Sequence, residues 1–118
     1  MKREIKFRGK RIDNGEWAFG FYVADVEWAN YYIYFPEHSG VFIKMKHTLV
    51  DPKTVGQFTG LTDKNGKEAF EGDITDEGVI IWHNEYLGFF VKDEQGEHTP
   101  LYDIPFFEII GNIYETKL

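Results

Sequence analysis

The 118-residue sequence contains no cysteine and a single serine, Ser39. Without cysteine the chain has no disulfide scaffold, thiolate zinc site, iron–sulfur cluster or cysteine nucleophile. Ser39 lies next to His38, and the surrounding residues do not form the strand–turn–helix pattern of a nucleophile elbow. Glycine-rich phosphate loops are absent as well. These absences favour a protein that is not an enzyme and uses no cofactor.

Long apolar runs are also missing. Residues 31–35 and 79–82 are among the longest, whereas a membrane helix needs about 20 apolar residues. The charged N-terminal residues are not followed by the apolar region of a secretory signal. We therefore expect a soluble, cytoplasmic protein that makes no membrane contact.

The chain is instead rich in aromatic residues (18%) and in turn signals. Short segments of Val, Ile, Phe, Tyr and Trp alternate with glycine-containing turns, which predicts an all-β fold of short strands and tight hairpins. Helical periodicity is nearly absent. At most one short helical turn is expected, at residues 51–54, because Asp51 would cap it and Pro52 would occupy its first position.

Two Asn-Gly pairs, at residues 14–15 and 65–66, predict two-residue type I′ hairpins. The first would place Ile12 opposite Trp17, and the second would place Leu61 opposite Phe70. In the first hairpin the apolar face changes side near Gly9. Either a β-bulge lies at Gly9, or the neighbouring Lys and Arg stems lie over aromatic rings.

After this turn, large apolar side chains occupy alternate positions. Trp17, Phe19, Phe21 and Val23 occupy every second position, which is the pattern of a half-buried strand. Residues 28–35 form a denser aromatic strand with no clear polar face. Such a strand is more often core or subunit interface than a ligand platform.

Three segments carry a family resemblance. They are residues 3–9 (REIKFRG), 50–74 (VDPKTVGQFTGLTDKNGKEAFEGDI) and 109–115 (IIGNIYE). Together they resemble the YopX family of small phage and prophage proteins, from which Ala69 departs in size. The resemblance implies an all-β protein with a small SH3-like barrel element, encoded by a phage or prophage. It implies no reaction and no catalytic residues.

We expect one domain over residues 1–118, with N-terminal hairpins in residues 1–49 and a barrel-like part at about 50–115. The net charge of −7 is unevenly distributed along this domain: residues 1–12 sum to +5 and residues 13–118 to −12. The basic residues interleave with aromatic ones, an arrangement that suits single-stranded nucleic acid. The more ordinary interpretation is a protected edge strand, or pairing with the acidic remainder. The candidate nucleic-acid contacts are Lys2, Arg3, Lys6, Arg8, Lys10 and Arg11.

Our first hypothesis is a non-catalytic module that binds another macromolecule, a protein rather than a nucleic acid, or associates with itself. Its candidate interface is the aromatic strand, with Trp28, Tyr31, Tyr32, Tyr34 and Phe35. A nucleic-acid-binding barrel that uses the basic strand is the alternative.

A metal-dependent enzyme is the lesser alternative. It would use Glu71, Asp73 and one of the four histidines. The structural interpretation of the carboxylate pair is that Asp73 caps backbone N–H groups of a turn, as Asp often does.

Overall fold

Short antiparallel strands provide nearly all the regular structure of residues 4–115, the part of the chain that the computed structural model describes. The only helical elements there are two single 3₁₀ turns, so the all-β prediction is confirmed. No helix in this part is long and apolar enough to cross a membrane. The chain divides into two compact units, residues 1–57 and 58–118.

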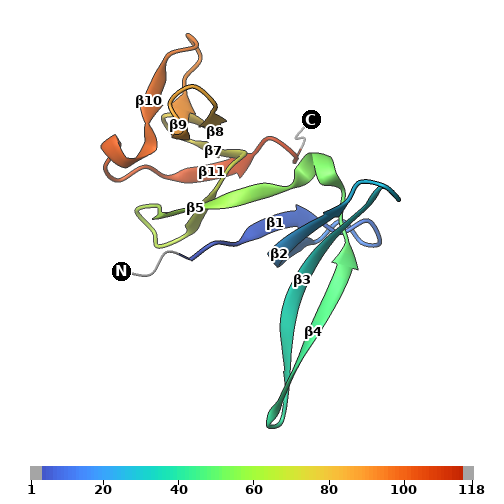
Figure 1. Cartoon of the computed structure of the whole chain (residues 1–118). Coiled ribbons are helices and arrows are strands. Elements are labelled where there is room, and N and C mark those ends of the chain that lie inside the picture. Colours follow the sequence, from blue (N-terminus) through green and yellow to red (C-terminus); the bar gives the residue numbers. More distant parts are fainter. Residues whose placement is uncertain (1–3, 116–118) are drawn as a thin grey trace. The chain divides into compact units, whose positions relative to one another are not determined.

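The first unit is an antiparallel sheet with the strand order β4-β3-β2-β1-β5 (Figure 1). Its strands are β1 (Phe7–Lys10), β2 (Trp17–Asp25), β3 (Asn30–Ser39), β4 (Phe42–Leu49) and the beginning of β5 (Gly56–Thr62). The predicted helical turn is confirmed as η1 (Pro52–Thr54). Asp51 caps η1, and its Oδ1 accepts the Lys53 N–H at 3.0 Å.

A small core lies on one face of this sheet. Ala18, Ile33 and Val50 are buried at its centre, and partly buried apolar side chains surround them: Phe7, Tyr22, Tyr31, Phe35 and Val55. Burial, followed by the nearby Tyr31, raises the pKa of Tyr22. Alternate residues of each strand contribute side chains to this core, because successive side chains of a strand point to opposite faces.

The first hairpin differs from its prediction by two residues. Lys10 pairs with Trp17, and four residues, 12–15, form the loop instead of two. The Arg11 N–H donates to Glu16 O at 2.8 Å, and Gly15 adopts the positive φ that closes the loop. A shift of two keeps every side chain on its predicted face. Gly9 pairs regularly with Ala18, so the bulge hypothesis is wrong.

The second Asn-Gly pair also closes a longer loop than predicted. The Asp63 N–H donates to Lys67 O at 2.8 Å, which leaves three loop residues that end in Gly66 with φ 81°. Phe70 consequently pairs with Phe58 and not with Leu61. Residues 93–97 form the same turn, with Gly96 at φ 82°. In both turns the aspartate accepts two backbone N–H bonds, a stabilisation that Asn-Gly alone does not reveal.

Strand β3 continues through Pro36, which the sequence suggests is the start of a turn. The β3–β4 ladder extends to Ser39 and Phe42, joined by a two-residue turn with Gly40 at φ 61°. Strand β2 pairs with β3 only at residues 30–34, so Pro36 removes no bond to β2. Residues 35–46 thus form a two-stranded arm that runs past the neighbouring strands (Figure 1).

The second unit contains the rest of β5, paired with β6 (Glu68–Phe70), and a five-stranded sheet with the order β10-β9-β8-β7-β11. The sheet strands are β7 (Asp73–Thr75), β8 (Gly78–His83), β9 (Gly88–Lys92), β10 (His98–Pro100) and β11 (Ile109–Asn112). The edge strands β10 and β11 do not pair with each other. Residues 4–115 therefore contain open sheets and no closed barrel, in contrast to the SH3-like element that the resemblance implies.

The core of the second unit is built from Ala69, Ile80, Val91, Leu101, Phe107 and Ile109, with Phe89 and Ile104 packed against it. Leu101 belongs to a second 3₁₀ turn, η2 (Leu101–Asp103), which was not predicted. Its N-cap is Pro100, and no side chain caps it. Because the usual capping signal is absent, burial of Leu101 is the visible reason for this turn.

Candidate interaction surface

The basic N-terminal strand lies against an aromatic ring. The Arg8 side chain is 5% exposed, and its guanidinium carbon lies 4.4 Å from the centre of the Trp17 ring. Lys10 approaches the same ring, with Nζ at 5.3 Å. The second explanation for the change of face near Gly9 is therefore confirmed: the basic stems cover an aromatic side chain. Lys2 and Arg3 lie outside the described residues.

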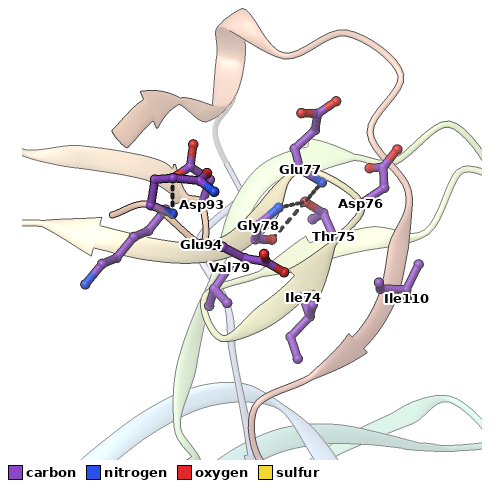
Figure 2. Close-up of a pocket in the computed structure, with 11 residues that line it drawn as sticks. Ile74, Thr75, Asp76, Glu77, Gly78, Val79, Asp93, Glu94 and Ile110 are labelled. Carbon is purple, nitrogen blue, oxygen red and sulfur yellow. Dashed lines mark hydrogen bonds between the residues drawn. The ribbon is translucent and has the colours of Figure 1, made fainter. Parts of the chain in front are cut away.

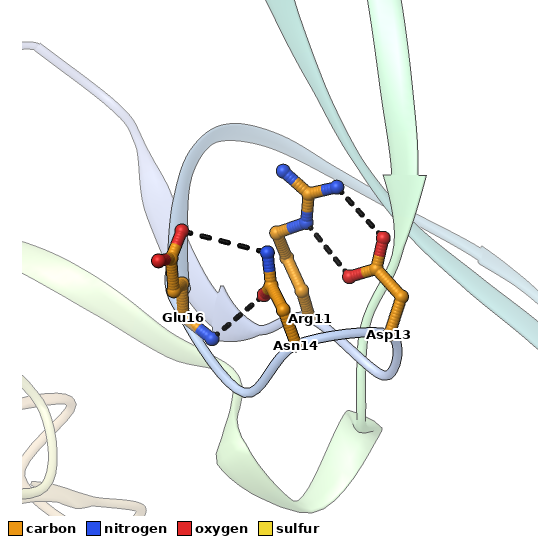
Figure 3. A network of polar contacts seen from close by, with 4 residues as sticks. All are labelled: Arg11, Asp13, Asn14 and Glu16. Carbon is orange, nitrogen blue, oxygen red and sulfur yellow. Dashed lines mark hydrogen bonds and ion pairs between the residues drawn. The ribbon is translucent and has the colours of Figure 1, made fainter.

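The other two candidate cations have acidic neighbours. Lys6 Nζ lies 3.6 Å from a Glu4 oxygen. Arg11 forms a two-point pair with Asp13, from Nε to Oδ1 at 3.0 Å and from Nη2 to Oδ2 at 2.8 Å (Figure 3). This hydrogen-bonded pairing raises the pKa of Arg11 and lowers the pKa of Asp13. Every described basic residue of this strand thus has a partner within the chain.

Strand β2 turns its larger apolar side chains outward. Phe19, Phe21 and Val23 are 44–57% exposed, whereas Ala18 is buried in the core and Tyr22 packs against that core. The alternation is as predicted, but the large apolar side chains, which would ordinarily be the buried set, face solvent. Apolar alternation ordinarily marks the core face, so its outward direction needs an explanation in function.

The register extends this outward set across three strands. Directly paired residues share a face, and Phe21 pairs with Tyr34 while Tyr34 pairs with His47. Across β2, β3 and β4 this surface carries no Asp, Glu, Lys or Arg, and β1 borders it with Arg8, which pairs with Phe19. We call it the aromatic face; it consists of Phe19, Phe21, Val23, Tyr32, Tyr34, Pro36, His38, Ile43, Met45, His47 and Leu49.

Ring contacts hold the middle of the aromatic face in order. Tyr34 and His47 stack with ring centres 5.0 Å apart and planes at 28°. Tyr32 meets the same imidazole edge-on at 5.3 Å. Such pairs fix side chains before any partner arrives, which lowers the entropy lost on binding. The face is therefore pre-organised at its centre.

A groove of about 530 Å³ borders the face at the end remote from the arm tip. It is lined by Arg11, Ile12, Asp13, Tyr32, His47, Thr48 and Leu49. The Ile12 N–H donates to Leu49 O at 3.1 Å and fixes the β1–β2 loop beside β4. Asn14 stiffens the same loop by accepting the Glu16 N–H at 2.9 Å (Figure 3). The groove thus combines an apolar wall with a charged, hydrogen-bonding rim.

The five predicted interface residues separate into three groups. Tyr32 and Tyr34 belong to the aromatic face, whereas Tyr31 and Phe35 pack against the core of the first unit. Trp28 lies in the turn between β2 and β3 and is 72% exposed. Strand β3 lacks a polar face because one of its sides packs against the core and the other side forms part of the aromatic face.

Sequence reasoning missed most of the aromatic face. The alternating residues of β2 were predicted only to form a half-buried strand, and Met45, His47 and Leu49 were not connected with them. The strict alternation in β2 and β4 was a usable signal. Only the pairing register shows that both alternating sets lie on one surface.

Glu71 and Asp73 lie at the turn that leads into β7. Asp73 is 1% exposed, and its Oδ2 accepts the Phe70 N–H at 2.8 Å, which confirms the capping prediction. Gly72 between them has φ 94°, and a Cβ there would meet the Tyr114 ring at 2.8 Å. Within residues 4–115, no group of three or more His, Asp and Glu side chains is arranged to hold a metal ion.

Two histidines far apart in the sequence meet in the second unit. The rings of His83 and His98 lie edge to face with centres 5.0 Å apart, beside Tyr86 and Phe90. Nδ1 of His83 accepts the N–H groups of Glu85 and Tyr86 at 3.2 and 3.3 Å. The imidazole therefore stabilises the turn after β8.

The second unit also has an acidic cleft of about 520 Å³ (Figure 2). Four carboxylates line it: Asp76, Glu77, Asp93 and Glu94. Asp76 accepts the Glu108 N–H at 2.9 Å, and Asp93 caps its own turn. Residues 58–118 hold four Lys or Arg and thirteen Asp or Glu, a net charge of −9, against +2 for the nine basic and seven acidic residues of 1–57. This cleft would repel an anionic ligand.

The fold and its surfaces define an all-β protein with an exposed, uncharged aromatic sheet face. Comparison with protein families gives a match to the YopX protein model over residues 6–117, nearly the whole chain. The chain belongs to the YopX family, which confirms the resemblance of its three segments. No curated protein matches the sequence.

Proposed function

We propose that this YopX-family chain is a non-catalytic protein-binding module and that the aromatic face is its contact surface. The observation that carries the proposal is the outward direction of the alternating apolar residues in β2. Large exposed apolar patches on folded proteins commonly mark interaction sites. Interface centres are enriched in aromatic residues and methionine and depleted of charge, and the aromatic face has the same composition.

Family membership and the resemblance to phage and prophage proteins support an origin in such an element and action in the cytoplasm of the host cell. The partner in this proposal is a protein. A nucleic acid needs accessible cations beside the aromatic rings. The cations that border the aromatic face, Arg8 and Lys10, lie over Trp17, and Arg8 is only 5% exposed. The described cations of the basic strand contact Trp17, Glu4 or Asp13 instead.

Affinity capture from host-cell extract tests the proposal. Tagged wild-type chain should recover a protein whether or not nuclease is added, and Phe21→Ser with Met45→Ser should lose it. Phe42→Ser is the matched control, because Phe42 lies on the opposite face of the arm and is 70% exposed. Recovery of the same proteins by all three chains would refute the proposal.

Two other hypotheses remain predictions with their own measurements. Binding through the basic strand would weaken steeply as salt rises, because phosphate contacts release counterions. A metal enzyme at Glu71 and Asp73 would retain a divalent ion through dialysis. Nuclease-sensitive capture would favour the first of these over a protein partner.

A further inference from the structure

We infer that the occupant of the aromatic face is a second copy of this chain, packed face to face about a twofold axis near Met45. The inference rests on the proposed function, because it names the partner of the same surface. It follows from the exposed area of the face, the placement of charge and the geometry of the arm.

The exposed area is close to what a stable dimer needs. Six apolar side chains of the face are 42–64% exposed: Phe19, Phe21, Val23, Ile43, Met45 and Leu49. They leave roughly 500 Å² of apolar surface in water, at the upper end for the largest patch of a monomer. A standard interface buries about 800 Å² per partner, core and rim together. The tyrosines, His47 and the groove rim supply the remainder.

The placement of charge favours stacking of faces over pairing of edges. Lys44 and Lys46 lie on the opposite face of the arm, where Lys46 pairs with Glu37 at 3.1 Å. If two β4 edges paired about Met45, Lys44 would stand opposite Lys46 of the second copy, and these like charges would repel. When the faces stack, both lysines remain in solvent and two uncharged surfaces meet.

The tip of the arm and the groove lie equally far from Met45 along the chain. The tip residue Val41 precedes Met45 by four positions, and the groove residue Leu49 follows it by four. Each interval spans about 13 Å of strand. A twofold axis that crosses β4 at Met45 therefore places each tip, where Val41 is 92% exposed, over the groove of the other copy. The contact is the same in both directions, as a twofold interface requires.

Sedimentation equilibrium from about 1 to 500 µM tests self-association. The wild-type chain should approach twice its monomer mass of 13.9 kDa. Ile43→Ser should raise the dimer dissociation constant roughly tenfold or more, as expected at the centre of an interface. Phe42→Ser, one residue away and on the other face, should change it little. A monomer throughout the range, or equal effects of the two substitutions, would overturn the inference.

Cross-linking tests the arrangement of the two copies. Because the chain has no cysteine, one introduced thiol per copy reports a single position. Stacked sheets lie about 10 Å apart, so a short bis-maleimide should join Met45→Cys into dimers. It should not join Lys44→Cys, which points to the opposite side. Equal cross-linking of both variants would refute the face-to-face arrangement.

Failure of this inference is distinguishable from failure of the proposed function. A monomer that still loses a captured protein on Phe21→Ser with Met45→Ser would refute self-association and support a different protein on the same face. If substitutions in the aromatic face cause no loss of any captured protein, and no loss of untagged copies of the chain, then both the self-association inference and the proposed function would be refuted.

Discussion

Replacement of Asp63 by asparagine tests whether one buried carboxylate joins two distant segments of the second unit. Asp63 is 6% exposed. Its Oδ1 accepts the N–H groups of Asn65 and Lys67, both at 2.9 Å, within its own turn. Its Oδ2 accepts the Ile109 N–H at 3.0 Å, from β11. The carboxylate therefore fixes the turn after β5 to the strand that ends the sheet.

Asparagine can supply one of these two oxygens but not both. If its oxygen keeps the turn, its amide group faces the Ile109 N–H, and two donors meet. A hydrogen bond to a charged group contributes about 1.5–3 kcal/mol, and a buried N–H without an acceptor costs about 1–3 kcal/mol. Because these are partly the same loss, we expect Asp63→Asn to lower the free energy of unfolding by about 2–4 kcal/mol.

The matched control is Asp93→Asn in the second turn of the same type. Oδ1 of Asp93 accepts the N–H groups of Gln95 and Glu97, both at 2.9 Å, and the turn is exposed. Asparagine can keep this oxygen and turn its amide group to solvent, so we expect a loss below about 0.5 kcal/mol. Urea unfolding followed by circular dichroism measures both. Equal losses would refute a special role for the bond to Ile109.

Measuring the free energy of unfolding of wild type and Asp63→Asn as a function of pH tests whether the negative charge of Asp63 stabilises the fold. Burial raises the pKa of Asp63. The N–H donors of Ile109, Lys67 and Asn65, together with the Lys67 charge, lower this pKa by a larger amount, so it lies below its usual value. A lowered pKa stabilises the fold fully above the unfolded value, about 3.9, and this stabilisation is lost as pH falls through the native pKa. The gap between wild type and Asp63→Asn should therefore narrow below about pH 4. A constant gap would refute the argument.

Two further substitutions test the first unit. In Gly20→Ala the added Cβ would lie 2.1 Å from Tyr34 O, so thermal unfolding should show a loss above about 2 kcal/mol, whereas Gly15→Ala, with open space around it, should lose about 1 kcal/mol from its positive φ alone. Asp13→Asn should leave the melting temperature unchanged, since the pair with Arg11 is exposed and such pairs contribute little; a clear drop would show that the pair supports the groove.

The fold class was predictable because it depends on local patterns. Alternation and turn residues mark short strands, and Asp51 followed by Pro52 marks η1. The loop lengths were not predictable from Asn-Gly alone. Asp63 accepts two N–H groups of its turn and thereby stabilises a three-residue loop, a preference that the dipeptide does not encode.

The candidate surface was only partly predictable, because alternation gives the period of a strand but not its direction. Phe19 and Phe21 share a face in any register, yet the choice of buried face is made by long-range packing. In this fold Ala18 and Tyr22 fill the core against Ile33. Sequence patterns therefore located the strand correctly, but the large apolar set that ordinarily marks the buried face lies on the exposed one, the reverse of the usual arrangement.

That reversal is itself informative about function. A strand can be stable with either face buried, but exposing the larger apolar set forgoes burial worth about 25 cal/mol per Å². The outward aromatic residues of β2 thus cost the monomer stability that a different register or a few polar substitutions would recover. Such a cost is expected where a surface is buried in a complex, and β3 and β4 extend the same uncharged surface. The proposed binding surface is therefore the place where local sequence preference and monomer stability disagree.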